Sequence, residues 1–401
     1  MPSYPLSRQG QIRGGTNPAL LAARRSGFPD IMFARSFGAP PPGLDCRQQP
    51  LKDGIQVSGT QDHEAQQTFA FLLLPDFAML CFSAAIEPLR VANRFAGRRL
   101  YDWQIVTLDG QPASSSGGTG VLADCALPDC ERPDYFLVVA GMNAQRFTDP
   151  QTIGALRRLD RSGCRVGALS TGSYLLARAG LLNGHRCTVH WENLDGFRED
   201  FPDLEVTGEL FEADGPRLTS SGGTASLDMM LSLIAKDHGR DLATQVAEQF
   251  IHERIRETHD HQRMSLQGRL GVSHPKLLQV IAMMEANLEE PLPRAELARQ
   301  AGLSNRQLER LFRKYLGRSP TRYYLELRLH RARALLLQTA MSILNVALAC
   351  GFVSASHFSK CYREFFNKMP RQERQGEEHQ TPRADTAAAQ DSQGSSIGQR
   401  R

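Results

Sequence analysis

The sequence predicts an α/β domain with a parallel sheet, followed by an all-α domain that carries two helix-turn-helix units. Two patterns indicate this fold class. Apolar runs alternate with helical segments in the first half of the chain, and a stretch of about twenty residues occurs twice near the C-terminus, about fifty residues apart. At 401 residues and 41% hydrophobic content, the chain is long enough for two globular domains.

The first domain alternates strands with helices from Thr68 onward. Continuous apolar runs predict buried strands at 69–74, 135–140 and 165–169. Apolar residues at helical spacing predict helices over 77–93, 152–161 and 173–179. Pro88 is expected to kink the first helix or to end it early. Strands that alternate with helices in this way favour a parallel sheet covered on both faces.

The turn Ala168-Leu-Ser-Thr-Gly172 joins the third strand to its helix. A strand that turns abruptly into a helix aims the turn residue into a cleft, where the first N–H groups of the helix have no intrahelical partner. Such groups bind anions, including carboxylates. We therefore expect Ser170 and Thr171 to contact a small ligand.

Three further residues are candidates for the same cleft. Glu87 would balance a cationic group, and His190 with Trp191 would form a polar and an aromatic wall. Each has a simpler alternative reading. Glu87 precedes Pro88 and would then pair only locally, while Trp191 would belong to the core.

The segment between the two domains reads as a helix and a linker. Residues 242–256 have an amphipathic pattern, and the polar stretch 257–275 contains Gly268, Gly271 and Pro275. His259 and His261 in this stretch are expected to be solvated rather than to hold a metal.

The cysteine pattern and the hydropathy restrict the possible classes of protein further. The chain has eight cysteines but no C-x-x-C pair, so we expect buried thiols in a reducing cytoplasm, with no metal and no cofactor. No apolar run reaches the ~20 residues that a membrane-spanning helix requires.

The repeat near the C-terminus consists twice of a helix, a glycine turn and a second helix. The first copy runs from Ala298 through Gly302 to Pro320, and the second from Ala347 through Gly351 to Pro370. The second turn is one residue longer than the first. Each glycine allows a sharp turn with positive φ.

The residues that bound each second helix also match between the copies. Ser304 and Ser354 are expected N-caps, and Ser304 has Gln307 at the capping-box position. Gly317 and Asn367 are expected left-handed caps, after which a proline stops each helix.

Each second helix has one apolar and one polar face. The apolar positions are Leu308, Leu311, Phe312 and Tyr315 in the first copy and Phe358, Cys361, Tyr362 and Phe365 in the second. In a helix-turn-helix of a DNA-binding protein, the second helix enters the major groove. The candidates for base edges are Arg306, Glu309, Arg310, Ser356, Ser359 and Lys360, and those for phosphates are Arg313, Lys314 and Arg363.

The charge distribution agrees with a DNA-binding surface on the repeat. Residues 276–374 hold 17 Lys and Arg against 8 Asp and Glu, a formal charge of +9 within a chain whose total is only +4. Such one-sided charge provides the positive field that binding to phosphates requires.

The chain resembles the AraC-type regulators from about Leu277 to Arg374, where the stretch beginning Gly351-Phe-Val-Ser-Ala-Ser-His-Phe-Ser-Lys is specific. In that family a long helix, here 321–338, joins two helix-turn-helix motifs. From about Thr68 to Asp237 the chain resembles the glutamine-amidotransferase-like domain of GlxA-like regulators. This second resemblance rests on the turn at Ser170 and on the stretches 177–184, 188–192 and 219–224.

One departure from the superfamily concerns catalysis. Its enzymes carry a nucleophilic Cys at the turn that here holds Ser170, and a serine hydroxyl requires an adjacent base. His190 with Asp195 or Asp228 would complete a Ser-His-Asp set, which makes a hydrolase or amidase the alternative function. We expect no catalytic residue and a retained ligand cleft, since a fold does not determine function.

The resemblance implies a ligand-responsive DNA-binding transcriptional regulator, an activator of amino-acid or quaternary-amine catabolism genes. Its implied partners are double-stranded DNA, a small zwitterionic effector such as arginine, glycine betaine or carnitine, RNA polymerase and a second copy of the chain, with no membrane. A third hypothesis is a ligand-independent DNA-binding protein whose sheet domain serves only for dimerisation.

The expected domain boundaries follow from these patterns. The sensing domain spans 67–240, the helix and linker 241–275, and the DNA-binding domain 276–374. Residues 1–66 and 375–401 read as a disordered arm and tail. The arm faintly resembles a transit peptide, but it lacks a sustained amphipathic helix, and Met32 is an alternative start.

Overall fold

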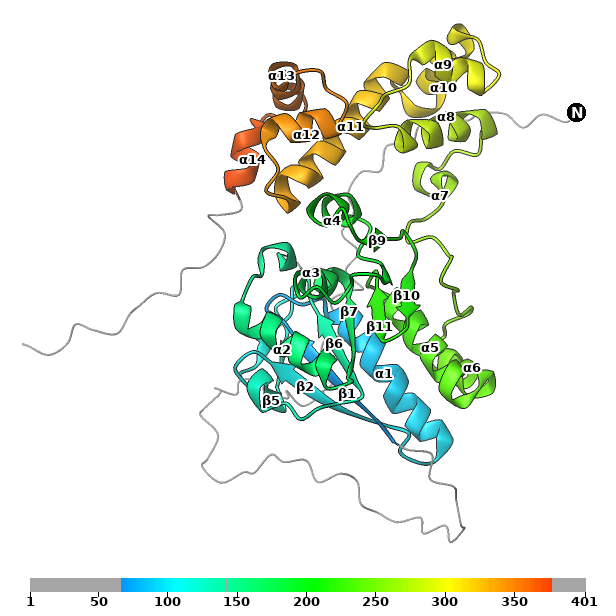
Figure 1. The fold of residues 1–401 in the computed structure, drawn as a ribbon. Coiled ribbons are helices and arrows are strands. Elements are labelled where there is room, and N and C mark those ends of the chain that lie inside the picture. The colour runs from blue at the N-terminus through cyan, green and yellow to red at the C-terminus, as the bar shows by residue number, and fades with distance from the viewer. Residues whose placement is uncertain (1–65, 142, 377–401) are drawn as a thin grey trace, which may run out of the picture. The chain divides into compact units, whose positions relative to one another are not determined.

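The computed structural model describes residues 66–141 and 143–376 (Figure 1). The predicted arm, 1–66, and the predicted tail, 375–401, lie outside the described residues except for residue 66 and residues 375–376, which belong to a helix. Within them, no helix is long and apolar enough to cross a bilayer.

A seven-stranded sheet forms the centre of the first domain, in the order β10-β11-β7-β6-β1-β2-β5. All neighbouring pairs are parallel except β10 with β11. The predicted parallel α/β architecture is therefore confirmed, with one antiparallel edge. The strands are β1 (Gln67–Leu73), β2 (Tyr101–Thr107), β5 (Cys125–Ala126), β6 (Tyr135–Val139), β7 (Arg165–Leu169), β10 (Phe211–Asp214) and β11 (Arg217–Ser220).

Helices cover both faces of this sheet because successive side chains of a strand point to opposite faces. Phe69 and Phe71 of β1 belong to a core shared with α1 (Met79–Ala96), α5 (Ala225–His238) and α6 (Arg240–Gln249). Ala70 and Leu72 belong to a second core. The helices of that face are α2 (Pro150–Arg161), α3 (Ser173–Arg178) and α4 (Leu194–Asp200).

Short elements complete this domain. They are the strand pairs β3 (Ala113–Ser114) with β4 (Gly120–Val121) and β8 (Arg186–Cys187) with β9 (Glu205–Val206), and the 3-10 turns η2 (Leu127–Asp129), η3 (Ala144–Arg146) and η4 (Ser170–Gly172).

The ends of two helices differ from expectation. Pro88 does not end α1 early: it lies inside the helix, which continues to Ala96 and ends at Gly97 with φ of 65°. The helix expected over 242–256 ends at Gln249, because Ile251 adopts a left-handed φ of 54°. A β-branched residue at positive φ cannot continue a right-handed helix.

The second domain is all-α, as predicted, and contains both helix-turn-helix units. Its helices are α8 (Pro275–Ala286), α9 (Arg294–Gln300), α10 (Asn305–Leu316), α11 (Pro320–Gln338), α12 (Ile343–Ala349), α13 (Ala355–Phe366) and α14 (Pro370–Gly376). One short helix, α7 (Leu266–Leu270), interrupts the predicted linker.

The predicted caps are present in both units. Ser304 Oγ accepts from the Gln307 backbone at 3.2 Å, and Gln307 Oε1 accepts from the Ser304 backbone at 2.8 Å, which completes the capping box. Gly317 and Asn367 are left-handed, with φ of 68° and 56°. The prolines differ from expectation: Pro320 and Pro370 do not end α10 and α13 but begin the next helices, where a missing N–H costs nothing.

Candidate DNA interface and ligand cleft

The first recognition helix, α10, buries one side and exposes basic groups on the other. Leu308 and Phe312 are fully buried. The side chains on the opposite side are exposed, apart from the half-buried Glu309: Arg306, Arg310, Arg313 and Lys314. Tyr315, predicted on the apolar face, is 38% exposed, and its ring lies tilted against His274 with centroids 5.6 Å apart. The exposed face thus offers guanidinium groups, which match guanine edges and phosphates.

Glu309 lies among arginines rather than alone. Its carboxylate pairs with Arg313 at 3.2 Å and lies 4.0 Å from Arg294 of α9. A shallow depression at this place is lined by Arg294, Asn305, Arg306, Glu309 and Arg310. The sequence pattern did not indicate Arg294 as a site residue, because only the folded helix-turn-helix brings the start of α9 beside α10.

The second recognition helix, α13, has the same polarity but fewer charges. Phe358 and Tyr362 are buried. Ser356, Lys360 and Arg363 are exposed, and Ser359 is half-buried. Two helices with this polarity, each after a glycine turn, have the form of paired DNA-recognition helices.

We expect Arg310→Ala and Arg313→Ala to affect DNA binding differently. Arg310→Ala should cost about 1 to 3 kcal/mol on the specific site and relax base preference, because Arg pairs with guanine edges. Arg313→Ala should weaken binding to every sequence and reduce the slope of log affinity against log salt by about one. Titrations of specific and random duplexes at several salt concentrations test this. Equal losses on both duplexes would show that the assigned roles are wrong.

The turn at Ser170 is strained and tightly packed. Ser170 has φ of 59°, a conformation that a residue with a side chain adopts rarely and mostly at functional sites. A Cβ on Gly222 would lie 2.8 Å from the Ser170 Cβ, so only glycine fits beside it. Cys81 Sγ accepts from the Gly223 backbone, and burial raises the pKa of its thiol. The surrounding structure therefore holds this turn in one conformation.

Ser170, Thr171 and His190 line one surface hollow at the turn after β7. Asn143, Gln145, Ser116 and Glu192 also line it. Burial lowers the pKa of His190, against the opposing effect of Glu192, which favours the neutral form of the ring. A neutral imidazole both donates and accepts hydrogen bonds. This polar hollow is the candidate ligand cleft.

Glu87 and Trp191 do not line this hollow. Glu87 lies on an exposed face of α1, where it pairs with Arg90 at 2.6 Å, as the simpler reading anticipated. Trp191 is 39% exposed, and the Arg263 guanidinium lies 4.5 Å from its ring centroid. Trp191 therefore contacts a cation of the linker.

The structure does not bring Asp228 to His190. The Asp228 carboxylate is fully buried and accepts from His252 Nε2 at 2.8 Å and from the Arg256 backbone and guanidinium at 2.7 and 2.6 Å. The acid beside His190 is Glu192, at 3.8 Å, rather than Asp195 or Asp228. The Ser-His-Asp arrangement considered from the sequence is thus not formed with Asp228.

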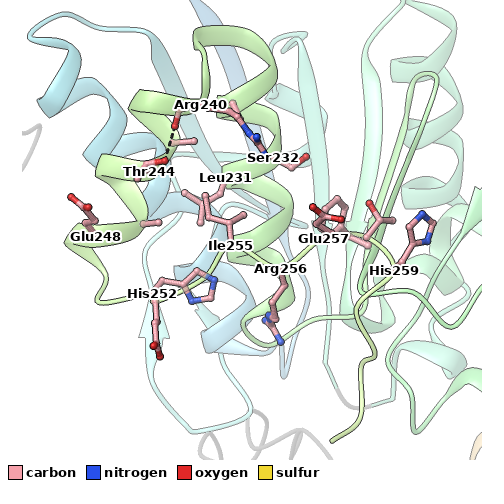
Figure 2. A pocket seen from close by; sticks show the side chains of 16 residues that line it. Leu231, Ser232, Arg240, Thr244, Glu248, His252, Ile255, Arg256, Glu257 and His259 are labelled. Atoms are coloured by element: carbon pink, nitrogen blue, oxygen red, sulfur yellow. Dashed lines mark hydrogen bonds between the residues drawn. The ribbon is translucent and has the colours of Figure 1, made fainter. Parts of the chain in front are cut away.

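The segment that Asp228 holds borders a second hollow, of about 750 Å³, which Figure 2 shows beside α5 and α6. Leu231, Ile255 and neighbouring apolar side chains line its inner part, and charged residues such as Arg240, Glu248 and Glu257 surround them. The helix predicted over 242–256 would leave no such hollow, because it would include part of the segment that lines it. Within the described ranges, no cluster of His, Cys, Asp or Glu is arranged to hold a metal.

Comparison with known proteins identifies both domains. Residues 82–236 match the model of the DJ-1/PfpI family, and residues 297–376 match a helix-turn-helix domain model. The HTH-type transcriptional regulators GbdR and CdhR of Pseudomonas aeruginosa are 50% and 52% identical to this chain. These alignments cover 78% and 77% of this chain and 85% and 91% of the relatives. GlxA of Rhizobium meliloti is 39% identical over 78% of this chain and 97% of its own.

A DJ-1/PfpI-type sheet domain followed by two helix-turn-helix units defines a DNA-binding transcriptional regulator. The chain belongs to the AraC-type family of GlxA- and GbdR-like regulators. The resemblance seen in the sequence is confirmed.

Proposed function

We propose that this protein activates genes of amino-acid or quaternary-amine catabolism when a small zwitterionic effector binds in the cleft at Ser170, Thr171 and His190. The observation that carries the proposal is the strained Ser170, which packs closely against Gly222 and lines a polar hollow. Strain of this kind persists where function requires a fixed geometry. Arginine, glycine betaine and carnitine are the effectors to try first.

The remaining partners follow from this role. We propose that the protein acts in the cytoplasm, contacts RNA polymerase at its promoters, binds DNA as a homodimer and catalyses no reaction. The predicted limits are 67–240 for sensing, 241–275 for the helix and linker, and 276–374 for DNA binding. The helix α6 of the middle segment packs into the core of the sheet domain.

Ser170→Ala distinguishes a binding site from a nucleophile. The substitution removes one hydroxyl and keeps the backbone N–H groups, so we expect a modest loss of affinity for the effector and unchanged DNA binding. A nucleophile would instead lose all ester or amide turnover. Calorimetric titration with each of the three zwitterions, beside assays of ester and amide hydrolysis, measures both.

Glu87→Gln is the matched control for this experiment. Its carboxylate pairs with Arg90 outside the hollow, so the response to the effector should not change. A larger loss with Glu87→Gln than with Ser170→Ala would move the site away from the proposed cleft.

The linker after α6 gives this cleft a route toward the DNA-binding domain. The Gln262 side-chain amide donates to Glu209 O at 2.8 Å, Thr188 Oγ1 at 3.0 Å and Val189 O at 3.2 Å. Thr188 and Val189 directly precede His190, which lines the cleft. Movement of His190 on binding would therefore act on contacts that hold the linker.

We expect Gln262→Ala to uncouple the two activities. Effector affinity and DNA affinity, each measured alone, should stay within about twofold of the values for the natural chain. The ratio of DNA affinity with effector to DNA affinity without it should fall toward one. Gln267→Ala, on exposed α7, is the control and should retain the coupling. Undiminished coupling in Gln262→Ala would exclude this route.

A further inference from the structure

The two helix-turn-helix units have separate hydrophobic cores. One core contains Leu297, Leu308, Phe312 and Tyr324, and the other contains Leu329, Leu336, Val346, Phe358 and Tyr362. Only α11 contributes buried side chains to both. A hollow of about 350 Å³, bordered by Met284, Leu292, Tyr324, Leu325 and His357, lies between the units. Few contacts other than α11 itself therefore fix one unit against the other.

Gly351 makes one of these contacts. It adopts φ of 72°, and a Cβ there would lie 2.7 Å from the Pro291 ring and 2.8 Å from Glu289 O. The turn of the second unit thus presses directly on the loop between α8 and α9 of the first. Gly302, its counterpart in the repeat, has φ of 61°, but its Cβ would meet only the Lys276 Nζ, at 3.5 Å.

Arg328 of α11 holds the same turn from the other side. Its Nε donates to Cys350 O and its Nη2 to Gly351 O, both at 2.7 Å, and its guanidinium lies 4.2 Å from the Phe352 ring centroid. One turn along α11, Arg331 donates to Ala349 O at 2.9 Å. These bonds satisfy carbonyls at the end of α12 that would otherwise lack partners.

The first unit has a weaker version of this arrangement. There Lys276 donates to Gly302 O at 2.8 Å, and Gln279 donates to Gln300 O at 3.4 Å. A lysine makes a point contact, whereas the planar guanidinium of Arg328 binds two carbonyls at once. The second turn therefore receives more and shorter side-chain hydrogen bonds than the first.

We propose that Gly351 and Arg328 form a rigid joint that fixes the angle between the two recognition helices, so that the protein selects operators by the spacing of their half-sites. The proposal rests on both helices binding one duplex. One base pair of added spacing moves a half-site by about 3.4 Å and turns it by about a tenth of a helical turn. A stiff joint cannot follow this change, but a loosened joint can.

The test uses the full-length protein and a duplex selected from random sequence, together with versions whose half-site spacing is one base pair longer or shorter. We expect the natural chain to lose at least about tenfold in affinity on the altered spacings. Gly351→Ala and Arg328→Lys should reduce this penalty to about threefold or less. Arg328→Lys keeps the charge, so it preserves the test if Gly351→Ala fails to fold.

Gly302→Ala is the matched control, because it places the same strain at a left-handed φ without obstructing any backbone. It should retain the full spacing penalty. Three results would overturn the proposal: a natural chain indifferent to spacing, a penalty that persists in Arg328→Lys, or equal loosening by Gly302→Ala. The affinity of each variant for a duplex with a single half-site shows whether the variant has lost DNA binding itself or only its preference for spacing.

Discussion

Phe312→Ala should lower the free energy of unfolding of the first helix-turn-helix unit by about 3 to 5 kcal/mol. Phe312 is fully buried and packs edge to face on Tyr323, with ring centroids 5.6 Å apart, so the truncation leaves a cavity that its neighbours fill only in part. Because the second unit has its own core, Phe358 and Tyr362 should remain protected.

Amide hydrogen exchange measured separately over α10 and α13 tests this independence. Tyr315→Ala, at a 38% exposed position of the same helix, is the control and should change stability little. Equal loss of protection in α10 and α13 would mean that the two units unfold together and that the cores are not separate.

Asp228→Ala should destabilise the sheet domain by about 3 kcal/mol, the low end for a broken buried ion pair. The substitution leaves Arg256 and His252 without their carboxylate, although both keep partial access to water. It should also release the segment after α6 that leads into the linker. Chemical denaturation gives the energy, and limited proteolysis near Arg254 detects the release.

Asp228→Asn separates charge from shape in this cluster. The amide oxygen can still accept from the Arg256 backbone, while the charge contact with the Arg256 guanidinium is lost. We expect a smaller loss than for Asp228→Ala. Full stability in both variants would show that Asp228 does not anchor this segment.

The sequence predicted those elements whose signals are local. The capping box at Ser304 and the left-handed caps at Gly317 and Asn367 depend on neighbouring residues only, and all were placed correctly. The strand β2 was missed because it contains no continuous apolar run: Asp102 and Gln104 alternate with apolar residues, a pattern that is itself typical of a half-buried strand. The helix α5 was missed for the opposite reason, since it is buried on nearly every side and shows no amphipathic period.

The candidate sites depend more on tertiary structure. Ser170, Thr171 and His190 meet in one hollow, but the exclusion of Glu87 depends on the direction in which α1 presents it. Arg294 contacts Glu309, and Arg328 donates to Gly351 O, although no sequence motif places either pair together. Contacts of this kind between separate elements can be identified only from the folded structure.

Hydroxyl-radical footprinting of the full-length protein on the DNA upstream of its own gene tests the central claim most directly. The two recognition helices of each chain, joined by α11, should protect two patches on one face of the duplex, about 34 Å apart, where successive major grooves face the protein. The second chain of the proposed homodimer should protect a pair of its own. A single protected patch of half a helical turn would contradict the account.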